Sequence, residues 1–155
     1  MIAAVGNADP GAGAREALQR DVRAGLEAFP SGAPVLVRAR AGLSLLIGRA
    51  VREAGRKLVL LLPSQAALPA ALPPRDHAAV GELLLLADQV RLLPFDPADR
   101  DACVSADERL IRGCGRVLAV WDGSPSSPQD PTAHLVAFAR GRGLPVHVIH
   151  PRAAR

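Results

Sequence analysis

The chain has 155 residues, of which 49% are hydrophobic, 22% are charged and 3% are aromatic. This composition is typical of one globular domain with an aliphatic core, and it excludes a disordered chain. The formal net charge is +4, from 19 basic and 15 acidic residues, but the basic residues are dispersed and do not alternate with aromatic ones. We therefore expect no dedicated nucleic-acid-binding surface.

Cysteine usage and the apolar segments exclude further classes. Cys103 and Cys114 are too few for a disulfide framework, and no Cys/His spacing is typical of a zinc site. The N-terminal residues lack the basic and long apolar regions of a signal peptide. The apolar stretch at residues 58–74 is interrupted by prolines, so it does not predict a membrane-spanning helix. We expect a cytoplasmic protein with no membrane partner, no metal site and no bound cofactor.

In chain order, apolar residues recur at strand spacing and at helix spacing in alternation. The predicted strands are residues 1–5, 34–37, 57–62, 90–95, 117–121 and 144–149. The predicted helices are residues 14–29, 43–54, 76–90, 101–114 and 132–142. Pro63 is expected to end the third strand, with residues 64–74 as a loop, and Asp76 is a candidate N-cap for the third helix.

The apolar pattern within the strands indicates how the sheet is covered. Residues 57–62 and 117–121 are continuous apolar runs, which is typical of strands buried on both faces of a parallel sheet. Alternating strands and helices with right-handed crossovers then give a doubly wound, Rossmann-like α/β fold. We expect about six mainly parallel strands with helices on both faces. One domain would span residues 1–150, followed by a flexible tail at 151–155.

Ligands bind such sheets at the carboxyl ends of the strands, so the loops that follow the strands carry the candidate site. The first of these loops contains Gly6, Asn7, Gly11 and Gly13, which would let the backbone approach a phosphate. Its spacing matches neither GxGxxG nor a nucleotide-triphosphate P-loop, so a plain turn is the alternative. After the second strand, Arg38 and Arg40 are candidates for binding phosphate or carboxylate, or are solvated surface residues.

The loop after residues 117–121 is the other candidate. Trp121, Asp122 and Gly123 stand where that strand ends, and Thr132 stands where the last helix begins. Asp122 would accept hydrogen bonds from ribose hydroxyls or cap local amides, and Thr132 would cap the helix or donate to a phosphate. The candidates for an acid–base role are Asp122, Glu108 and His134. No catalytic triad, metal triad or carboxylate pair is recognisable.

The segment RVLAVWDGSPSSPQDPTAHLVAFARGRGLPVHVI resembles the C-terminal part of the SLOG superfamily, which includes the Lonely Guy proteins. The matching residues are Trp121, Asp122, Gly123, Thr132, Gly143, Pro145 and Val146. More loosely, AGLSLLIGRAVREAGRKLVLLLP resembles the turn, helix and strand that these proteins have upstream. The resemblance implies a nucleotide-type ligand, such as a nucleoside monophosphate or an NAD-related molecule, and hydrolysis of an N-glycosidic bond.

The sequence departs from this family at the residues that carry the chemistry. Asp130 and Pro131 stand where the family has paired glycines before the Thr, and His134 stands where it has an acidic residue. Proline has no amide hydrogen to donate, and an aspartate would repel a phosphate. These three departures argue against phosphate binding by this loop and against hydrolysis by the family's mechanism.

Three hypotheses follow. The leading one is a module that binds a nucleotide-derived small molecule through the 6–13 loop, Asp122, Gly123 and Thr132, with an altered hydrolase site. The second is an active nucleoside 5'-monophosphate glycosidase that uses Asp122 or Glu108. The third is a non-catalytic interaction domain, for which the high Leu and Ala content favours a homodimer.

Overall fold

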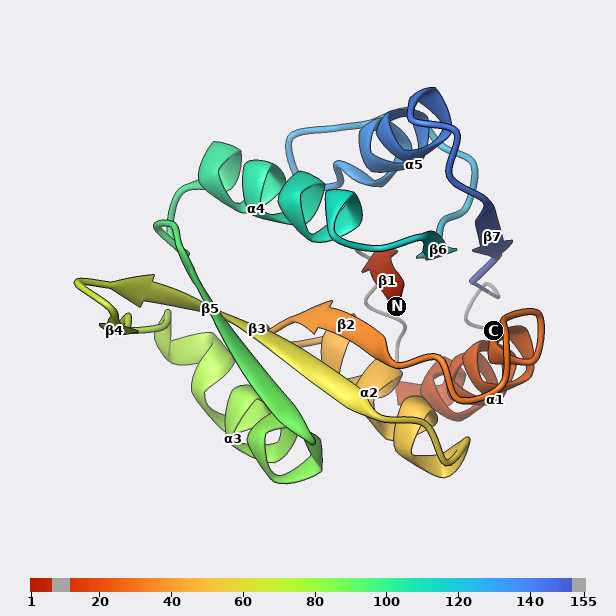
Figure 1. Ribbon diagram of the computed structural model, residues 1–155, viewed down its shortest axis with the longest axis horizontal. Helices are drawn as coiled ribbons and strands as arrows, with labels where there is room; N and C mark the ends of the chain where they lie inside the picture. Colours follow the sequence, from red (N-terminus) through yellow and green to blue (C-terminus); the bar gives the residue numbers. More distant parts are fainter. Residues whose placement is uncertain (7–11, 152–155) are drawn as a thin grey trace.

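Strands and helices alternate along the chain, as the hydrophobic pattern predicts (Figure 1). The structure is a computed structural model that describes residues 1–6 and 12–151. The strands are β1 (Ile2–Gly6), β2 (Val35–Arg38), β3 (Leu58–Gln65), β4 (Leu68–Pro69), β5 (Gln89–Pro94), β6 (Arg116–Val120) and β7 (Val146–Ile149). The helices are α1 (Arg15–Leu26), α2 (Leu43–Glu53), α3 (His77–Leu86), α4 (Arg100–Arg112) and α5 (Thr132–Gly141). Short 3₁₀ turns, η1 (Ala12–Ala14) and η2 (Pro74–Asp76), precede α1 and α3.

The strands form one seven-stranded sheet in which β1 is central. From edge to edge the main order is β5-β3-β2-β1-β6-β7, and all of these neighbours are parallel. The chain builds outward from β1 to β5 on one side and then returns to place β6 and β7 on the other. This confirms the predicted doubly wound, mainly parallel α/β fold, with its topological switch point between β1 and β6.

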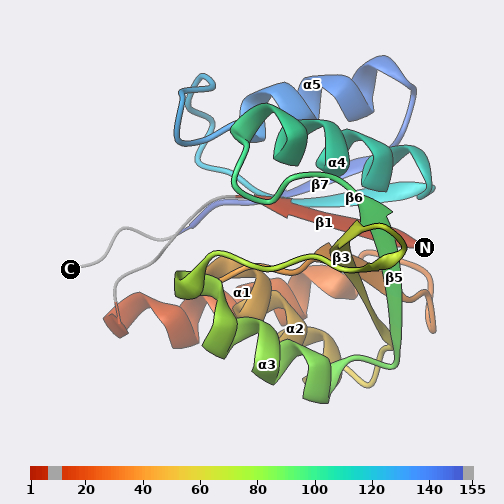
Figure 2. The ribbon, with the colours of Figure 1, turned by 90° about the vertical axis from the view of Figure 1, so that its left-hand side faces the viewer.

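Helices cover both faces of the sheet (Figure 2). Helices α1, α2 and α3 pack side by side on one face, and α4 and α5 pack together on the other. Because side chains alternate along a strand, β1 serves two cores. Ile2 and Ala4 belong to the core beneath α1–α3, and Ala3 and Val5 to the core beneath α4 and α5. Among the described helices, none has both the length and the apolar character needed to cross a bilayer.

The prediction that Pro63 ends the third strand is wrong, because β3 continues to Gln65. The main-chain carbonyl of Leu61 points toward β2, where it accepts from the Ala39 amide at 2.9 Å. Main-chain groups of alternate residues point to the same side of a strand, so those of Pro63 also point toward β2. β2 ends at Arg38, so no β2 residue lies opposite Pro63. The missing proline N–H therefore removes no hydrogen bond between the two strands. The Pro63 carbonyl instead accepts from Ala70 at 2.9 Å.

Part of the predicted 64–74 loop is a β-hairpin, since β4 pairs antiparallel with the end of β3. Its two turn residues, Ala66 and Ala67, have φ angles of 51° and 65°. Hairpin turns of this conformation normally contain Asn or Gly, which adopt positive φ at little cost. Two alanines give no such signal, so the sequence did not predict the hairpin.

The predicted N-cap role of Asp76 is also wrong. No side-chain hydrogen bond caps α3, and the Asp76 carboxylate accepts instead from the Ala41 amide at 3.0 Å. The third helix ends at Leu86, earlier than predicted, because Asp88 already joins the sheet. Its amide donates to the Leu58 carbonyl, and its carboxylate accepts from the Leu58 amide, each at 2.9 Å.

A buried arginine fixes the end of α1. Arg56 donates to four main-chain carbonyls that follow one another around the turn after this helix. These are Leu26 and Pro30 at 2.8 Å, Ala33 at 3.1 Å and Phe29 at 3.2 Å. The last carbonyls of a helix have no partner inside the helix, so a buried cation here replaces the water that they have lost.

Candidate functional site

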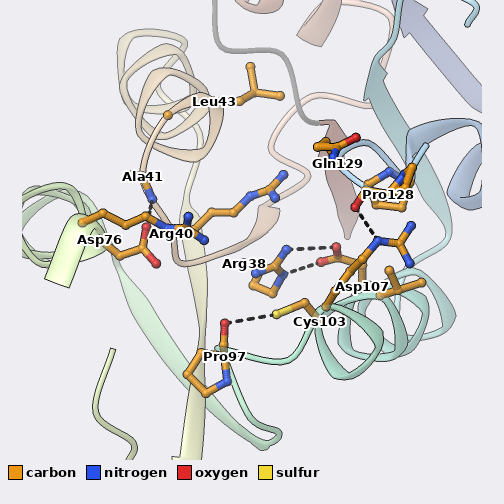
Figure 3. A pocket seen from close by; sticks show the side chains of 15 residues that line it. Arg38, Arg40, Ala41, Leu43, Asp76, Pro97, Cys103, Asp107, Pro128 and Gln129 are labelled. Carbon is orange, nitrogen blue, oxygen red and sulfur yellow. Dashed lines mark hydrogen bonds and ion pairs between the residues drawn. The ribbon is translucent and has the colours of Figure 1, made fainter. Parts of the chain in front are cut away.

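A pocket of about 490 Å³ opens at the carboxyl edge of the sheet, between the end of β2 and α4 (Figure 3). Its walls come from the end of β2 and the loop after it, the start of α2, η2, the loop before α4, the first turns of α4 and the β6–α5 loop. The lining residues are Arg38, Arg40, Ala41, Gly42, Leu43, Arg75, Asp76, Pro97, Arg100, Cys103, Val104, Asp107, Pro128, Gln129 and Pro131. The volume is in the range of small-molecule sites in proteins.

An ion pair forms the floor of the pocket. Arg38 Nε and Nη2 donate to the two carboxylate oxygens of Asp107 at 2.7 and 3.2 Å, and both side chains are buried (Figure 3). Burial by itself lowers the pKa of Arg38, but the charge and hydrogen bonds of Asp107 outweigh it and the net pKa is raised. Arg38 is therefore a cation whose charge is already neutralised by its partner.

Arg40 is a second cation in the same wall, with a less favourable environment. Its guanidinium donates to the carbonyl of Gly6, at the end of β1. Burial and the neighbouring Arg38 cation lower the pKa of Arg40. An anion in the pocket would offset both effects, because a negative charge nearby favours the charged form of the buried guanidinium.

Arg100 connects α4 to the β6–α5 loop. Its Nε donates to the Pro128 carbonyl at 2.6 Å, and its Nη2 donates to the Ser127 carbonyl at 3.0 Å. Asp99 caps α4 by accepting from the Asp101 amide at 3.1 Å. Arg100 therefore stands in a fixed position and holds the loop residues at the mouth of the pocket.

Cys103 is the nucleophilic side chain in the pocket wall. Its thiol donates to the Pro97 carbonyl at 3.5 Å (Figure 3). Burial raises the pKa of the Cys103 thiol, so it is predominantly a neutral thiol at physiological pH. The side chain is half-buried, and within the described chain Cys114 is the other free cysteine, fully buried elsewhere.

The charges around the pocket do not cancel. Among the described residues, four arginines and two aspartates line it, which leaves 4 − 2 = +2 formal charges. Asp107 is committed to Arg38, while Arg75 is exposed and has no hydrogen bond or ion pair with the described residues. The pocket therefore favours an anionic ligand.

The structure brings together only some of the predicted ligand-binding residues. Arg38 and Arg40 line the pocket. Gly6 reaches it indirectly, through the Arg40 hydrogen bond, and a Cβ at Gly6 would lie 2.6 Å from Leu43 Cδ2. Asn7 and Gly11 lie outside the described residues, and Gly13 is exposed in η1.

Trp121, Asp122 and Gly123 form a closed local turn outside the pocket. The Trp121 indole donates to the Ser124 carbonyl, and Asp122 accepts from the Ser124 amide, each at 2.9 Å. Hydrogen bonds from the side chain and the amide of Ser124 lower the pKa of the exposed Asp122 carboxyl. Gly123 turns the chain with a φ of 86°. A ligand contact at Asp122 stays a prediction.

Thr132 lies buried at the start of α5. Its amide and its hydroxyl both donate to Asp130 Oδ1, at 2.9 and 2.5 Å. Two residues further along the helix, the His134 amide donates to the Ser126 hydroxyl at 2.8 Å. The loop therefore caps its own helix, which is the alternative role that the sequence left open for Thr132.

The three acid–base candidates do not form one site. His134 Nε2 lies 3.8 Å from Glu108 Oε1, and this pair joins α5 to α4. Asp122 is held in its own turn, and none of the three lines the pocket. Among residues 1–6 and 12–151, no group of His, Cys, Asp or Glu side chains could hold a metal ion.

Several residues of the pocket were not predicted from the sequence, although the spacing along α4 contains a helical signal. Arg100, Cys103, Val104 and Asp107 recur at the spacing of one face of α4. The same stripe continues into the second half of α4, where Leu110 and Ile111 are buried in the core. Polar residues at the N-terminal end of the core-facing stripe of a helix, at the carboxyl edge of the sheet, would have identified this wall. Arg75 and Asp76 gave no comparable signal.

The comparisons with known proteins support the fold. No family model and no curated protein matches the chain. A molybdenum cofactor carrier protein from Chlamydomonas reinhardtii has a similar structure, with 17% identity, a TM-score of 0.57, and coverage of 95% of this chain and 74% of that one. The structural-genomics protein TM1055 is 20% identical, with a TM-score of 0.56 and coverage of 94% and 71%. At these identities the likeness is one of Rossmann-like fold.

Proposed function

We propose that this protein binds a nucleotide-derived small molecule, of the nucleoside monophosphate or the NAD and ADP-ribose type, in the arginine-lined pocket. The observation that carries the proposal is the excess of two positive charges among the described residues around a cavity of about 490 Å³, at the carboxyl edge of the sheet. Its size suits a mononucleotide, and its charge suits a phosphate. The resemblance to SLOG proteins in the Trp121–Gly123 and Thr132 region supports the same ligand class.

We propose further that the hydrolase site of such proteins is altered here. The acidic position of the family holds His134, which pairs with Glu108 away from the pocket. Of the two carboxylates that the described residues place in the pocket wall, Asp107 accepts from Arg38 with both oxygens, and Asp76 accepts from the Ala41 amide. Neither is placed as a free general acid or base.

Thermal unfolding with AMP, NAD and ADP-ribose at millimolar concentration tests the binding. We expect at least one to raise the melting temperature, and Arg40→Gln to reduce that increase. Arg116→Gln is the matched control, because this exposed arginine begins β6 at the opposite edge of the sheet. The molybdenum cofactor is a further ligand for the panel, since one structural neighbour carries it. No shift with any ligand would refute the proposal.

The glycosidase alternative has its own readout. Adenine release from AMP, abolished by Asp122→Asn or Glu108→Gln, would establish the enzyme and overturn the altered-site proposal. We expect no release above the uncatalysed rate across AMP, GMP, CMP and UMP.

A second candidate function, self-association, rests on a separate observation. The five exposed large apolar side chains of the described chain all lie on β4, α3 and β5, at one edge of the sheet: Leu68, Leu84, Leu85, Val90 and Leu92. Leu85 is 88% exposed. β5 pairs only with β3 among the described strands, so its outer side is open to another strand.

The partner that fits this edge best is a second copy of the chain. An isologous two-fold contact places the same apolar patch on both sides, and antiparallel β5 strands would continue the sheet. Sedimentation equilibrium at micromolar concentration should show a dimer, and Leu85→Glu should make it monomeric. Arg140→Glu on α5 serves as the control. A monomeric wild-type chain would refute this candidate.

A further inference from the structure

Asp76 is a carboxylate in the pocket wall that uses little of its capacity to accept hydrogen bonds. It comes from η2, whereas Asp107, the other carboxylate of the described lining residues, comes from α4 (Figure 3). Both oxygens of Asp107 accept from Arg38, but only Oδ1 of Asp76 accepts from a described residue, the Ala41 amide at 3.0 Å. Two carboxylate oxygens together accept about four hydrogen bonds. Asp76 therefore has room for a further donor.

The second oxygen of Asp76 is reached from the pocket. The side chain lines the cavity and is only 8% exposed. Among the described residues, every side-chain nitrogen or oxygen that is fully enclosed has a hydrogen-bond partner. Oδ2 has none with these residues, so it is not fully enclosed. A ligand that fills the cavity would exclude water from Oδ2, and a carboxylate oxygen left without a donor costs binding free energy.

The charge of the pocket indicates which kind of donor fits this oxygen. The described lining residues have a formal charge of 4 − 2 = +2, which disfavours an ammonium group on the ligand. Asp76 would itself repel a phosphate, but it interacts electrostatically with both Arg38 and Arg40, so it lies close to groups that attract one. A ligand with a phosphate for the arginines and a neutral hydroxyl for Asp76 meets both conditions.

We infer that Asp76 is a specificity-determining residue that accepts a hydrogen bond from a sugar hydroxyl of the phosphorylated ligand. This inference rests on the proposed function and makes it more specific: the ligand class is a ribose phosphate, recognised by its hydroxyl groups as well as by its charge. Analogues that keep the base and the phosphate but lack the ribose hydroxyls should bind more weakly, because they leave a buried carboxylate oxygen unpaired.

Isothermal titration with AMP, 2'-deoxy-AMP, 3'-deoxy-AMP and 2',3'-dideoxy-AMP tests the inference. The four compounds have the same base and the same phosphate, so they differ only in the hydroxyl groups of the sugar. We expect AMP to bind the wild-type chain at least about 10-fold more tightly than 2',3'-dideoxy-AMP, because a hydrogen bond to a charged group is lost. One of the two monodeoxy compounds should reproduce this loss, which identifies the hydroxyl that Asp76 binds.

Asp76→Asn separates recognition of the hydroxyl from the effect of charge. Asparagine keeps one oxygen for the Ala41 amide, replaces the other by an NH₂ group and removes a negative charge. We expect this variant to bind 2',3'-dideoxy-AMP more tightly than wild type does, and to prefer AMP by only about 3-fold or less. A general loss of structure would instead weaken the binding of both compounds.

Asp96→Asn is the matched control. It removes an equal charge from the loop before α4, where Asp96 accepts from the Ala98 amide and is not a lining residue of the pocket. The preference for AMP over 2',3'-dideoxy-AMP should stay at its wild-type value in this variant. Circular dichroism verifies that both variants are folded.

The outcomes separate the inference from the proposed function. Equal binding of AMP and 2',3'-dideoxy-AMP by the wild-type chain, a comparison that needs no variant, would overturn the inference and leave nucleotide binding intact. An undiminished preference for AMP in folded Asp76→Asn would overturn it as well. Absence of binding by all four compounds would overturn the proposed function itself.

Discussion

The Arg38–Asp107 ion pair should stabilise the fold and limit anion binding at the same time. In Asp107→Asn the shape of the side chain is kept, but the Arg38 guanidinium loses its counter-charge. The Arg38 and Asp107 side chains are only 10% and 9% exposed. Leaving one buried partner without the other typically costs about 3–5 kcal/mol, out of a total of about 5–15 kcal/mol for a domain.

The same substitution should strengthen the binding of phosphate. Loss of the Asp107 charge raises the formal charge of the described lining residues from 4 − 2 = +2 to 4 − 1 = +3. It also releases Arg38 to face the ligand. Stability and affinity should therefore change in opposite directions, which a general loss of structure cannot produce.

Urea unfolding followed by circular dichroism measures the stability, and titration of AMP measures the affinity. The double variant Arg38→Met/Asp107→Leu is the comparison, because an apolar pair of similar volume removes both charges together. We expect it to be more stable than Asp107→Asn, and to bind AMP no better than wild type. A cost below about 1 kcal/mol for Asp107→Asn would refute the assigned role of this buried pair.

Three other predictions concern separate parts of the molecule. Arg56→Met should lower the free energy of unfolding in urea by about 3 kcal/mol or more, because four buried carbonyls lose their hydrogen-bond donor. A loss under about 1 kcal/mol would contradict this. Replacing Ala66-Ala67 by Asn-Gly should stabilise the protein by about 1 kcal/mol, since both residues have positive φ; a lower melting temperature would contradict it. Iodoacetamide should modify Cys103 more slowly than a free cysteine at pH 8, because its raised pKa reduces the thiolate fraction, and faster as the pH rises. Bound AMP should protect Cys103, and buried Cys114 should stay unmodified throughout; modification of Cys103 at the same rate with saturating AMP would place the ligand elsewhere.

The regular elements were predictable because their signal is local. Continuous apolar runs such as β3 and β6 indicated buried parallel strands, and the alternation with helices then determined the doubly wound fold. The exceptions are features that depend on a neighbour. The sequence cannot reveal that Pro63 is tolerated, because this depends on where β2 ends.

The site was harder to predict for the same reason. Arg38 and Arg40 were recognisable from their place after a strand, but the role of Arg38 depends on Asp107, 69 residues away. Asp76 was interpreted as a helix cap, whereas it binds an amide from the β2–α2 loop, 35 residues away. A polar side chain has several local uses, and only the tertiary structure selects among them.

The start of α5 explains why the arginines, and not a helix N-terminus, should hold the phosphate. A helix N-terminus binds anions through its free amides. Here the amide of Thr132 is taken by Asp130, that of His134 is taken by Ser126, and Pro131 has none. Asp130 also brings a negative charge to this position. If Asp130→Gly frees the Thr132 amide and removes the negative charge, it should create a second phosphate contact and tighten AMP binding, while Ser124→Gly in the same loop should not. Unchanged affinity in Asp130→Gly would show that the capped terminus lies too far from the ligand.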